Sequence, residues 1–254
     1  MLGLDDYYAY PDDEGNPANE DVCGGVDMMD NNIGDHGAYS KYLLNWTSPY
    51  VIDGTQNSVT INLKPFESSG KFILLGNEFN DSAFDEYINI EYYTPTGLNE
   101  KDKNGYADGL NTYTQAGIKI NHIDSRIVQD FYNNYDEIDH SLYINSFDDE
   151  YGYYSICASN TPSSSYDLDG YNFNSFRLNH LIEANKNYTF NTSNYMDNYG
   201  SNDVLFHTGD SFSLSTYSNF FVNGATLNNG KTLPYTITIG SVNQDGSITI
   251  TITK

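Results

Sequence analysis

Positive charge is scarce in this chain of 254 residues, which carries 11 basic against 35 acidic residues and a formal net charge of −24. Nucleic acids and anionic membranes attract a positive surface, so this balance argues against both as partners. No apolar run reaches the ~20 residues that a membrane-spanning helix needs, and no signal peptide stands at the start. The acidic side chains could simply solvate the surface, or they could hold calcium, which prefers carboxylate and carbonyl oxygens.

Histidine and cysteine are also scarce, which limits the metal and nucleophile chemistry of the sequence by itself. None of the five histidines forms an H-x-H or H-x-x-x-H pair, so spacing reveals no self-contained zinc site. No Ser/His/Asp arrangement or phosphate-binding glycine loop stands out. Cys23 and Cys157 could form one disulfide or remain unpaired. We favour the unpaired state, because Cys23 lies in a glycine-rich turn and Cys157 in a strand-like run.

Aromatic residues are abundant, with 24 tyrosines and 13 phenylalanines, and polar and apolar residues alternate from about residue 50 onward. This period of two, together with one short apolar run, predicts strands at 58–63, 71–75, 87–92, 117–123, 151–157, 233–239 and 247–253. The Asp245-Gly246 step predicts a hairpin between the last two strands. Residues 173–182 fit a strand or a short helix equally well. Many short strands with little helix indicate a mainly β chain and an antiparallel β-sandwich.

The clearest helix is predicted over residues 36–46. Its apolar face repeats with helical spacing and consists of Tyr39, Tyr42, Leu43 and Trp46. Asp35 is the expected N-cap, and Pro49 stops the helix soon after its end.

The first eight residues match the second half of a zinc-peptidase motif. In the extended form of H-E-x-x-H, a glycine follows the second histidine by three residues, and a third metal ligand follows the glycine by three more. With the second histidine just before Met1, Gly3 is that glycine and Asp6 is the third ligand. A glycine there tolerates the positive φ that ends the helix and reverses the chain. Such a short string is more often a plain loop, so independent support is needed.

Support comes from the next segment, Gly24 to Asp30, which resembles the methionine turn beneath the zinc ion of metzincins. Met29 is the expected turn methionine and Met28 is the alternative. The stretch 34–49 then resembles the helix and exit segment of the immune inhibitor A family of secreted metallopeptidases. Members of that family typically read x-Tyr-x-Lys-x-x-Leu-Gly-Trp-x-x-Pro, and this chain has Asn45 in place of the glycine.

A third match lies at 85–93 and 116–124, which are similar to a strand pair of the same family, with Tyr92-Tyr93 in place of an Asn-Arg pair. The resemblance thus covers about residues 1–130 in an ordered series. It implies the C-terminal portion of a metallopeptidase catalytic domain at 1–49, made of loops and one helix, followed by a β-sandwich domain at 50–254.

The resemblance also implies a chemistry. In the intact enzyme, zinc-bound water would attack a peptide carbonyl, with the glutamate of H-E-x-x-H as base and Asp6 completing the metal site. This chain lacks that segment, so no catalytic residue lies within it, and we expect neither proteolysis nor tight zinc binding from the chain alone. The expected partners are a protein or peptide substrate and the missing N-terminal part of the catalytic domain. We expect secretion to the extracellular space, with a signal peptide upstream.

Two further hypotheses stay open. The loop 99–109 faintly resembles a calcium loop, with candidate ligands Asp102, Asn104 and Asp108. It lacks the terminal bidentate glutamate of such loops, so an ordinary polar hairpin loop is favoured. The alternative function is a non-catalytic extracellular β-sandwich module, in which tyrosine-rich strands contact glycan or protein through apolar ring faces.

Overall fold

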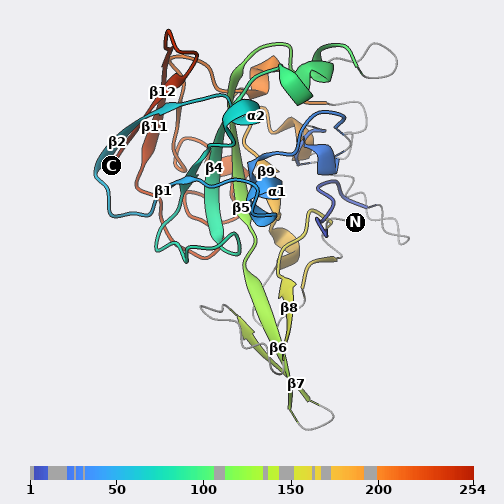
Figure 1. Ribbon diagram of the computed structural model, residues 1–254. Helices are drawn as coiled ribbons and strands as arrows, with labels where there is room; N and C mark the ends of the chain where they lie inside the picture. Colours follow the sequence, from blue (N-terminus) through green and yellow to red (C-terminus); the bar gives the residue numbers. More distant parts are fainter. Residues whose placement is uncertain are drawn as a thin grey trace.

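In the computed structural model, strands dominate the chain and form three sheets (Figure 1). The described residues are 3–10, 22–25, 27–30, 32–105, 112–133, 137–142, 152–161, 164–166, 173–191 and 199–254. The predicted mainly β class is therefore confirmed. Among the described residues, no helix has the length and apolar character needed to cross a membrane.

The largest sheet has five strands in the order β1-β3-β4-β5-β9. Their bounds are Tyr50–Ile52, Ile73–Leu75, Glu86–Tyr93, Gly117–Asp124 and Asn179–Leu181. Neighbouring strands run antiparallel except β1 and β3, which pair in parallel. The antiparallel arrangement that we predicted is wrong for this one pair of strands. A parallel pair needs a crossover connection, and the chain between β1 and β3 supplies it by first adding β2 to another sheet.

The second sheet has four antiparallel strands in the order β10-β11-β12-β2, with bounds Ser211–Phe212, Thr236–Val242, Ile248–Thr253 and Ser58–Leu63. The predicted hairpin joins β11 and β12, and its turn is closed by the Asn243 amide, which donates to the Ser247 carbonyl at 2.7 Å. A third sheet, in the order β7-β6-β8, projects from the rest in Figure 1. Its strands span Glu137–Leu142, Ile127–Asn133 and Gly152–Ile156.

The helices of the described ranges are short. The α-helices among them are α1 (Ala38–Leu43) and α2 (Phe66–Ser69). The described 3₁₀ helices are η1 (Met28–Asp30), η2 (Gly97–Lys103), η5 (Phe173–Ser175), η6 (Thr189–Asn191), η8 (Asn202–Val204) and η9 (Ser218–Phe220). The ambiguous segment 173–182 therefore contains both a helical turn, η5, and a strand, β9.

Helix α1 is shorter than the predicted 36–46, and its N-cap is Gly37 rather than Asp35. Carboxylates from other parts of the chain replace a local cap. Asp27 accepts a hydrogen bond from the Gly37 amide, and Glu91 accepts one from the Ala38 amide, each 2.8 Å long. The helix ends before Asn45, whose φ is +58°. Trp46 lies beyond that end and is 56% exposed, so it does not belong to the buried helical face that we predicted.

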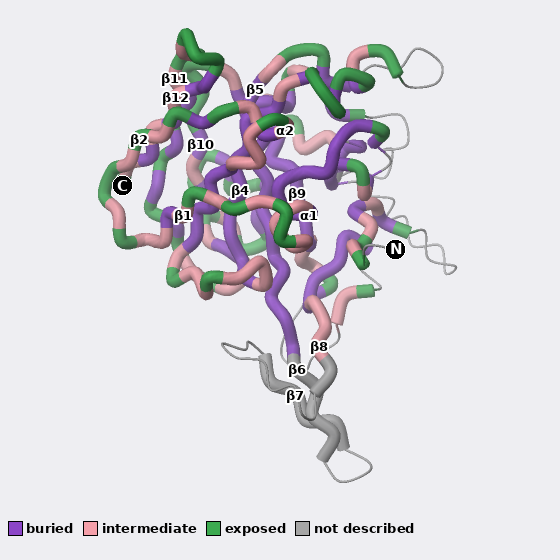
Figure 2. Tube along the Cα trace, in the orientation of Figure 1, coloured by how far each residue is buried: buried purple, intermediate pink, exposed green. Residues whose placement is uncertain are grey.

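The main hydrophobic cluster contains buried residues of both large sheets, which means that the apolar faces of the two sheets pack together. It includes Ile88 and Ile90 of β4, Ile118 and Ile120 of β5, and Ile237, Ile239, Ile248, Ile250 and Ile252 of β11 and β12. On β11 and β12 the threonines between these isoleucines are exposed or half-buried, as alternation predicts. Strands β4 and β5 are different, since every residue of both is buried (Figure 2).

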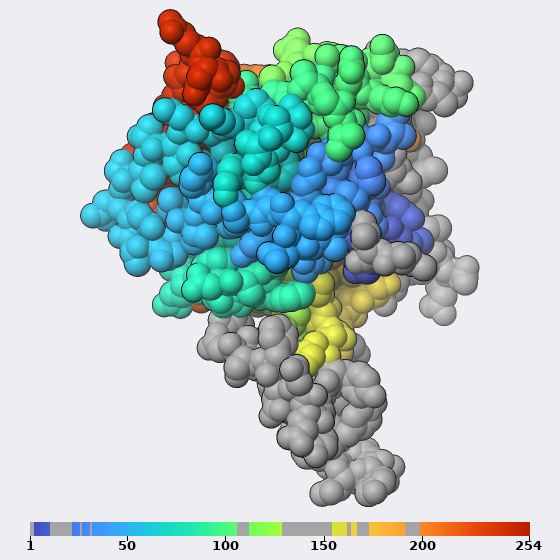
Figure 3. Space-filling model, viewed as in Figure 1, coloured from blue at the N-terminus to red at the C-terminus, as the bar shows by residue number. Residues whose placement is uncertain are grey.

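A second cluster covers the other face of the five-stranded sheet. Tyr7, Ala38 and Tyr39 pack there against Leu74, Tyr87 and other residues of the sheet. In Figure 3 the blue atoms of the segment around α1 lie beside the cyan atoms of the chain around β1 and β2. Residues on both sides of position 49 therefore share one hydrophobic cluster, while the proposed domain division at that position stays a prediction.

Both cysteines are buried thiols in different parts of the interior. Cys23 belongs to the cluster under α1, and its Sγ donates to the carbonyl of Asn179 at 3.0 Å. Cys157 belongs to a separate cluster with Val128 and Phe173.

Candidate functional sites

The predicted zinc ligand and the predicted methionine turn lie against each other. The amide of Tyr7, the residue after Asp6, donates a hydrogen bond of 2.9 Å to the carbonyl of Met29. Asp6 itself is half-buried, and its Oδ2 accepts hydrogen bonds from the hydroxyls of Tyr8, at 3.2 Å, and Tyr10. Two segments that sequence reasoning treated separately thus meet near the N-terminal end of the described chain.

The two candidate turn methionines have different surroundings. Met29 is half-buried and packs against the hydrophobic cluster under α1, whereas Met28 is 42% exposed. The fold of the turn depends on Asp27, whose Oδ1 accepts the amide of Met29 at 3.0 Å and whose Oδ2 accepts the amide of Gly37 at 2.8 Å. One buried carboxylate therefore ties η1 to the start of α1, which is a role that we did not predict.

Beneath α1 the five-stranded sheet presents buried polar side chains. Glu91 and Lys119 face each other on β4 and β5, with 2.6 Å between Oε1 and Nζ. Burial by itself lowers the pKa of Lys119, but the negative charges of Glu91 and Asp27 outweigh burial and raise that pKa above its ordinary value. The ammonium group is therefore held in its charged form as the counter-ion of both carboxylates.

The candidate calcium ligands that the structure describes differ in burial. Asp102 is buried, and its Oδ2 accepts a hydrogen bond of 2.6 Å from the hydroxyl of Tyr93. Asn104 lies at the exposed end of η2, and Asp108 is outside the described residues. Over the described parts of the chain, no three His, Cys, Asp or Glu side chains are grouped so that they could hold a metal ion. Calcium binding by this loop stays a prediction, as does the role of Asp6 as one ligand of a larger zinc site.

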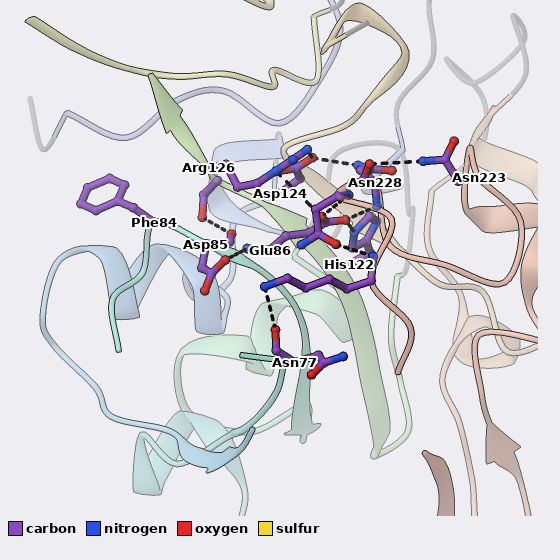
Figure 4. Close-up of polar contacts among 12 residues, drawn as sticks. Asn77, Phe84, Asp85, Glu86, His122, Asp124, Arg126, Asn223 and Asn228 are labelled. Atoms are coloured by element: carbon purple, nitrogen blue, oxygen red, sulfur yellow. Dashed lines mark hydrogen bonds and ion pairs between the residues drawn. The ribbon is translucent and has the colours of Figure 1, made fainter. Parts of the chain in front are cut away.

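A second candidate site lies at the other end of β4 and β5, where four charged or titratable side chains are buried together (Figure 4). Nε2 of His122 lies 2.8 Å from Oε1 of Glu86, and the guanidinium of Arg126 donates to both oxygens of Asp124 at 2.7 and 2.8 Å. The loop after β10 contacts these side chains through Asn228, whose side-chain amide donates a hydrogen bond of 2.8 Å to Asp124.

In this ionic cluster of Glu86, His122, Asp124 and Arg126, the pKa values of the two carboxylates shift in opposite directions. Burial raises the pKa of Glu86, and the negative charge of Asp124 raises it further. Burial also opposes ionisation of Asp124, but the hydrogen bonds and positive charge of Arg126 prevail and lower its pKa below the ordinary value. At neutral pH the charge of Asp124 is therefore stabilised by its surroundings, whereas the charge of Glu86 is costly.

Beside the ionic cluster lies a cavity of about 170 Å³. His122 of β5 and His180 of β9 stand directly opposite each other in the strand register, and both line the cavity. Aromatic rings form another part of its wall, namely Tyr188, Phe220 and Phe221. Spacing along the chain could not reveal this pair of histidines, because a long segment separates two strands that become neighbours only in the sheet.

Comparison with protein-family models, curated proteins and solved structures finds no match to this chain. The resemblance to the immune inhibitor A family therefore stays a prediction from the sequence motifs.

Proposed function

We propose that this chain carries the C-terminal part of a zinc-peptidase active site of the immune inhibitor A type, in which Asp6 is the third zinc ligand. The observation that carries this proposal is the hydrogen bond from the Tyr7 amide to the Met29 carbonyl, 2.9 Å long. In a metzincin the methionine turn lies beneath the metal, so the proposal requires the ligand segment to adjoin that turn. Met29, rather than the more exposed Met28, is the proposed turn methionine.

Two backbone conformations support the same proposal. Gly3 has a φ of +75°, the left-handed conformation that the motif needs where the active-site helix ends and the chain reverses. Asn45 has a φ of +58° at the position where the family pattern has glycine. After glycine, asparagine is among the residues that adopt this conformation most readily, so the substitution preserves the backbone that the family pattern requires.

In the intact enzyme, zinc would supply a Lewis acid that acidifies a bound water molecule. From this chain, Asp6 would hold the metal, and the hydroxyls of Tyr8 and Tyr10 would orient its carboxylate through Oδ2. The proposal places the two histidine ligands and the glutamate base in a segment outside this sequence, so we expect no peptidase activity from the chain alone. The joint core of the two large sheets supports the proposal that a β-sandwich follows the catalytic portion of a secreted peptidase.

The first experiment uses the chain as it stands. After dialysis against zinc-free buffer, we expect far less than one zinc ion per chain by atomic absorption, and no measurable cleavage of casein. Stoichiometric zinc, or casein cleavage that the substitution Asp6→Ala abolishes, would show that the chain forms a complete site and would overturn the proposal.

The second experiment concerns the coding sequence immediately upstream. The proposal predicts an open frame that ends in His-Glu-x-x-His directly before Met1. In a protein expressed with that segment, Asp6→Ala should remove stoichiometric zinc and peptidase activity. Asp5→Ala is the matched control, because Asp5 is the neighbouring acidic residue and lies on the exposed surface. A stop codon close upstream, or equal zinc loss in both variants, would contradict the assignment.

A further inference from the structure

The cavity beside the ionic cluster lies between the sheet, the segments that flank β9 and the loop that follows β10. The sheet contributes His122 and His180, which are 3% and 5% exposed. The loop contributes five of the ten lining residues, namely Asn219, Phe220, Phe221, Val222 and Asn228. The shape of the cavity therefore depends on how this loop is held against the strands.

Buried carboxylates hold the loop in place. The amides of Asn228 and Asn229 donate to the two oxygens of Glu86, and the side chain of Asn228 donates to Asp124 at 2.8 Å. A buried carboxylate that loses its hydrogen-bond donors is destabilised, so detachment of the loop from the sheet is disfavoured. The cavity wall is thus preorganised, and a ligand that enters it does not have to order the loop.

The lining combines aromatic rings with polar side chains, and Arg177 adds a cationic one. Ring contacts link the aromatic residues to the histidines: the Phe221 ring lies 5.0 Å from that of His122, and the Phe220 ring lies 5.8 Å from that of His180. Amide and hydroxyl groups at the cavity come from Asn219, Asn228 and Ser175. Among the described residues that line the cavity none is acidic, although the chain has 35 acidic residues.

This combination matches the chemistry of a sugar ring. The C–H faces of a pyranose are apolar and stack on aromatic rings, while its hydroxyls exchange hydrogen bonds with amides and imidazoles. The volume of about 170 Å³ is below the ~300–1,000 Å³ of sites for drug-sized ligands, so it limits the occupant to a single ring.

We propose that this cavity binds one hexopyranose ring of a glycan, with the ring face against Phe220 and Phe221 and the hydroxyls on Asn219, Asn228 and the two histidines. The site is remote in sequence from the proposed zinc ligand and does not depend on it. Under this proposal glycan binds in a defined cavity, whereas the sequence indicated binding on tyrosine-rich strands.

The test is a titration of the purified chain with D-glucose, D-galactose and D-glucuronate, each followed by isothermal titration calorimetry and by NMR of the histidine rings. We expect saturable binding of at least one sugar with a Kd in the millimolar range, as suits a ligand of this size. Tighter binding of glucuronate than of glucose would show that an acidic sugar is preferred. The ring signals of His122 and His180 should shift with the sugar, and those of His36 and His207 should stay in place.

Asn219→Ala is the informative variant, because Asn219 is exposed at the cavity and its loss should not disturb the fold. We expect affinity to fall at least about fivefold, in line with the loss of one good hydrogen bond. Asn57→Ala, at an exposed asparagine beside the start of β2, is the matched control and should leave affinity unchanged. Absence of saturable binding by all three sugars, shifts confined to other histidines, or equal affinity in the two variants would overturn the proposal.

Discussion

The carboxylate of Glu91 and the ammonium group of Lys119 lie 2.6 Å apart in the interior, and neither side chain is more than 6% exposed. The other oxygen of Glu91 accepts the amide of Ala38, the first residue of α1. The pair therefore joins the sheet to the helix, and through the helix to the segment that carries the proposed zinc ligand.

Removal of one member of this pair should destabilise the whole fold. In Lys119→Met, Glu91 and Asp27 lose their shared counter-ion while both remain buried, so we expect the free energy of unfolding to fall by about 3–5 kcal/mol. Urea unfolding followed by circular dichroism measures the change.

The control for that variant is an exposed ion pair. Glu78 and Lys231 lie 3.0 Å apart, with the Glu78 side chain 79% exposed. Because solvent screens such a pair, Glu78→Gln should lower the free energy of unfolding by less than about 1 kcal/mol. Equal effects of the two substitutions would mean that the Glu91–Lys119 pair is not buried in solution.

The buried polar face of β4 and β5 also shows which part of the fold the sequence could predict and which part it could not. Alternation located both strands correctly, because a period of two follows from strand geometry alone. It could not reveal that the polar face is covered, since α1 and the turn near Asp27 reach that face through tertiary contacts. Asn89 and Asn121, opposite each other on β4 and β5, likewise resemble solvent-facing residues in sequence but are buried.

Asn45 provides a test of the backbone match to the family pattern. Its φ of +58° is costly for a residue with an ordinary Cβ, so Asn45→Ala should lower the free energy of unfolding by about 1 kcal/mol. Asn45→Gly should leave it within about 0.5 kcal/mol of the natural chain, because glycine adopts this conformation without strain. Urea unfolding of both variants gives the comparison, and a stabilising effect of alanine would rule out the left-handed conformation.

The Asp124–Arg126 contact predicts a specific dependence of stability on pH. The pKa of Asp124 in the folded protein lies below its ordinary value of 3.8, so ionised Asp124 stabilises the fold above that value. This contribution is lost as pH falls through the lowered pKa. The destabilisation caused by Asp124→Asn should therefore be large at neutral pH and should shrink below about pH 3.8, because protonated aspartate and asparagine then resemble each other.

Unfolding free energies of the natural chain and of Asp124→Asn, measured by urea titration across this pH range, test the dependence. Asp81→Asn is the control, since Asp81 is exposed and should change stability by less than about 0.5 kcal/mol at every pH. A difference for Asp124→Asn that stays constant or grows as pH falls would contradict the assigned direction of the pKa shift.

As with the fold, one candidate site could be predicted from the sequence and the other could not. The segments of Asp6 and Met29 could be found from the sequence because each carries a short motif with fixed internal spacing. The cavity between His122 and His180 could not, because it depends on the pairing of β5 with β9 and on a loop held by buried carboxylates. No local spacing encodes either relationship, and the one signal available in the sequence was the general abundance of aromatic residues.

The cysteines provide a test of the interior packing and of their chemical state together. Cys23 and Cys157 are 1% and 0% exposed, so a water-soluble thiol reagent should react with neither in the native protein. After unfolding in guanidinium chloride, two thiols per chain should react, because the structure holds both cysteines as thiols. An absorbance assay with a chromogenic disulfide counts them under both conditions. Rapid reaction in the native state would contradict the burial of these residues, and the absence of reactive thiols in the unfolded chain would reveal a disulfide between them.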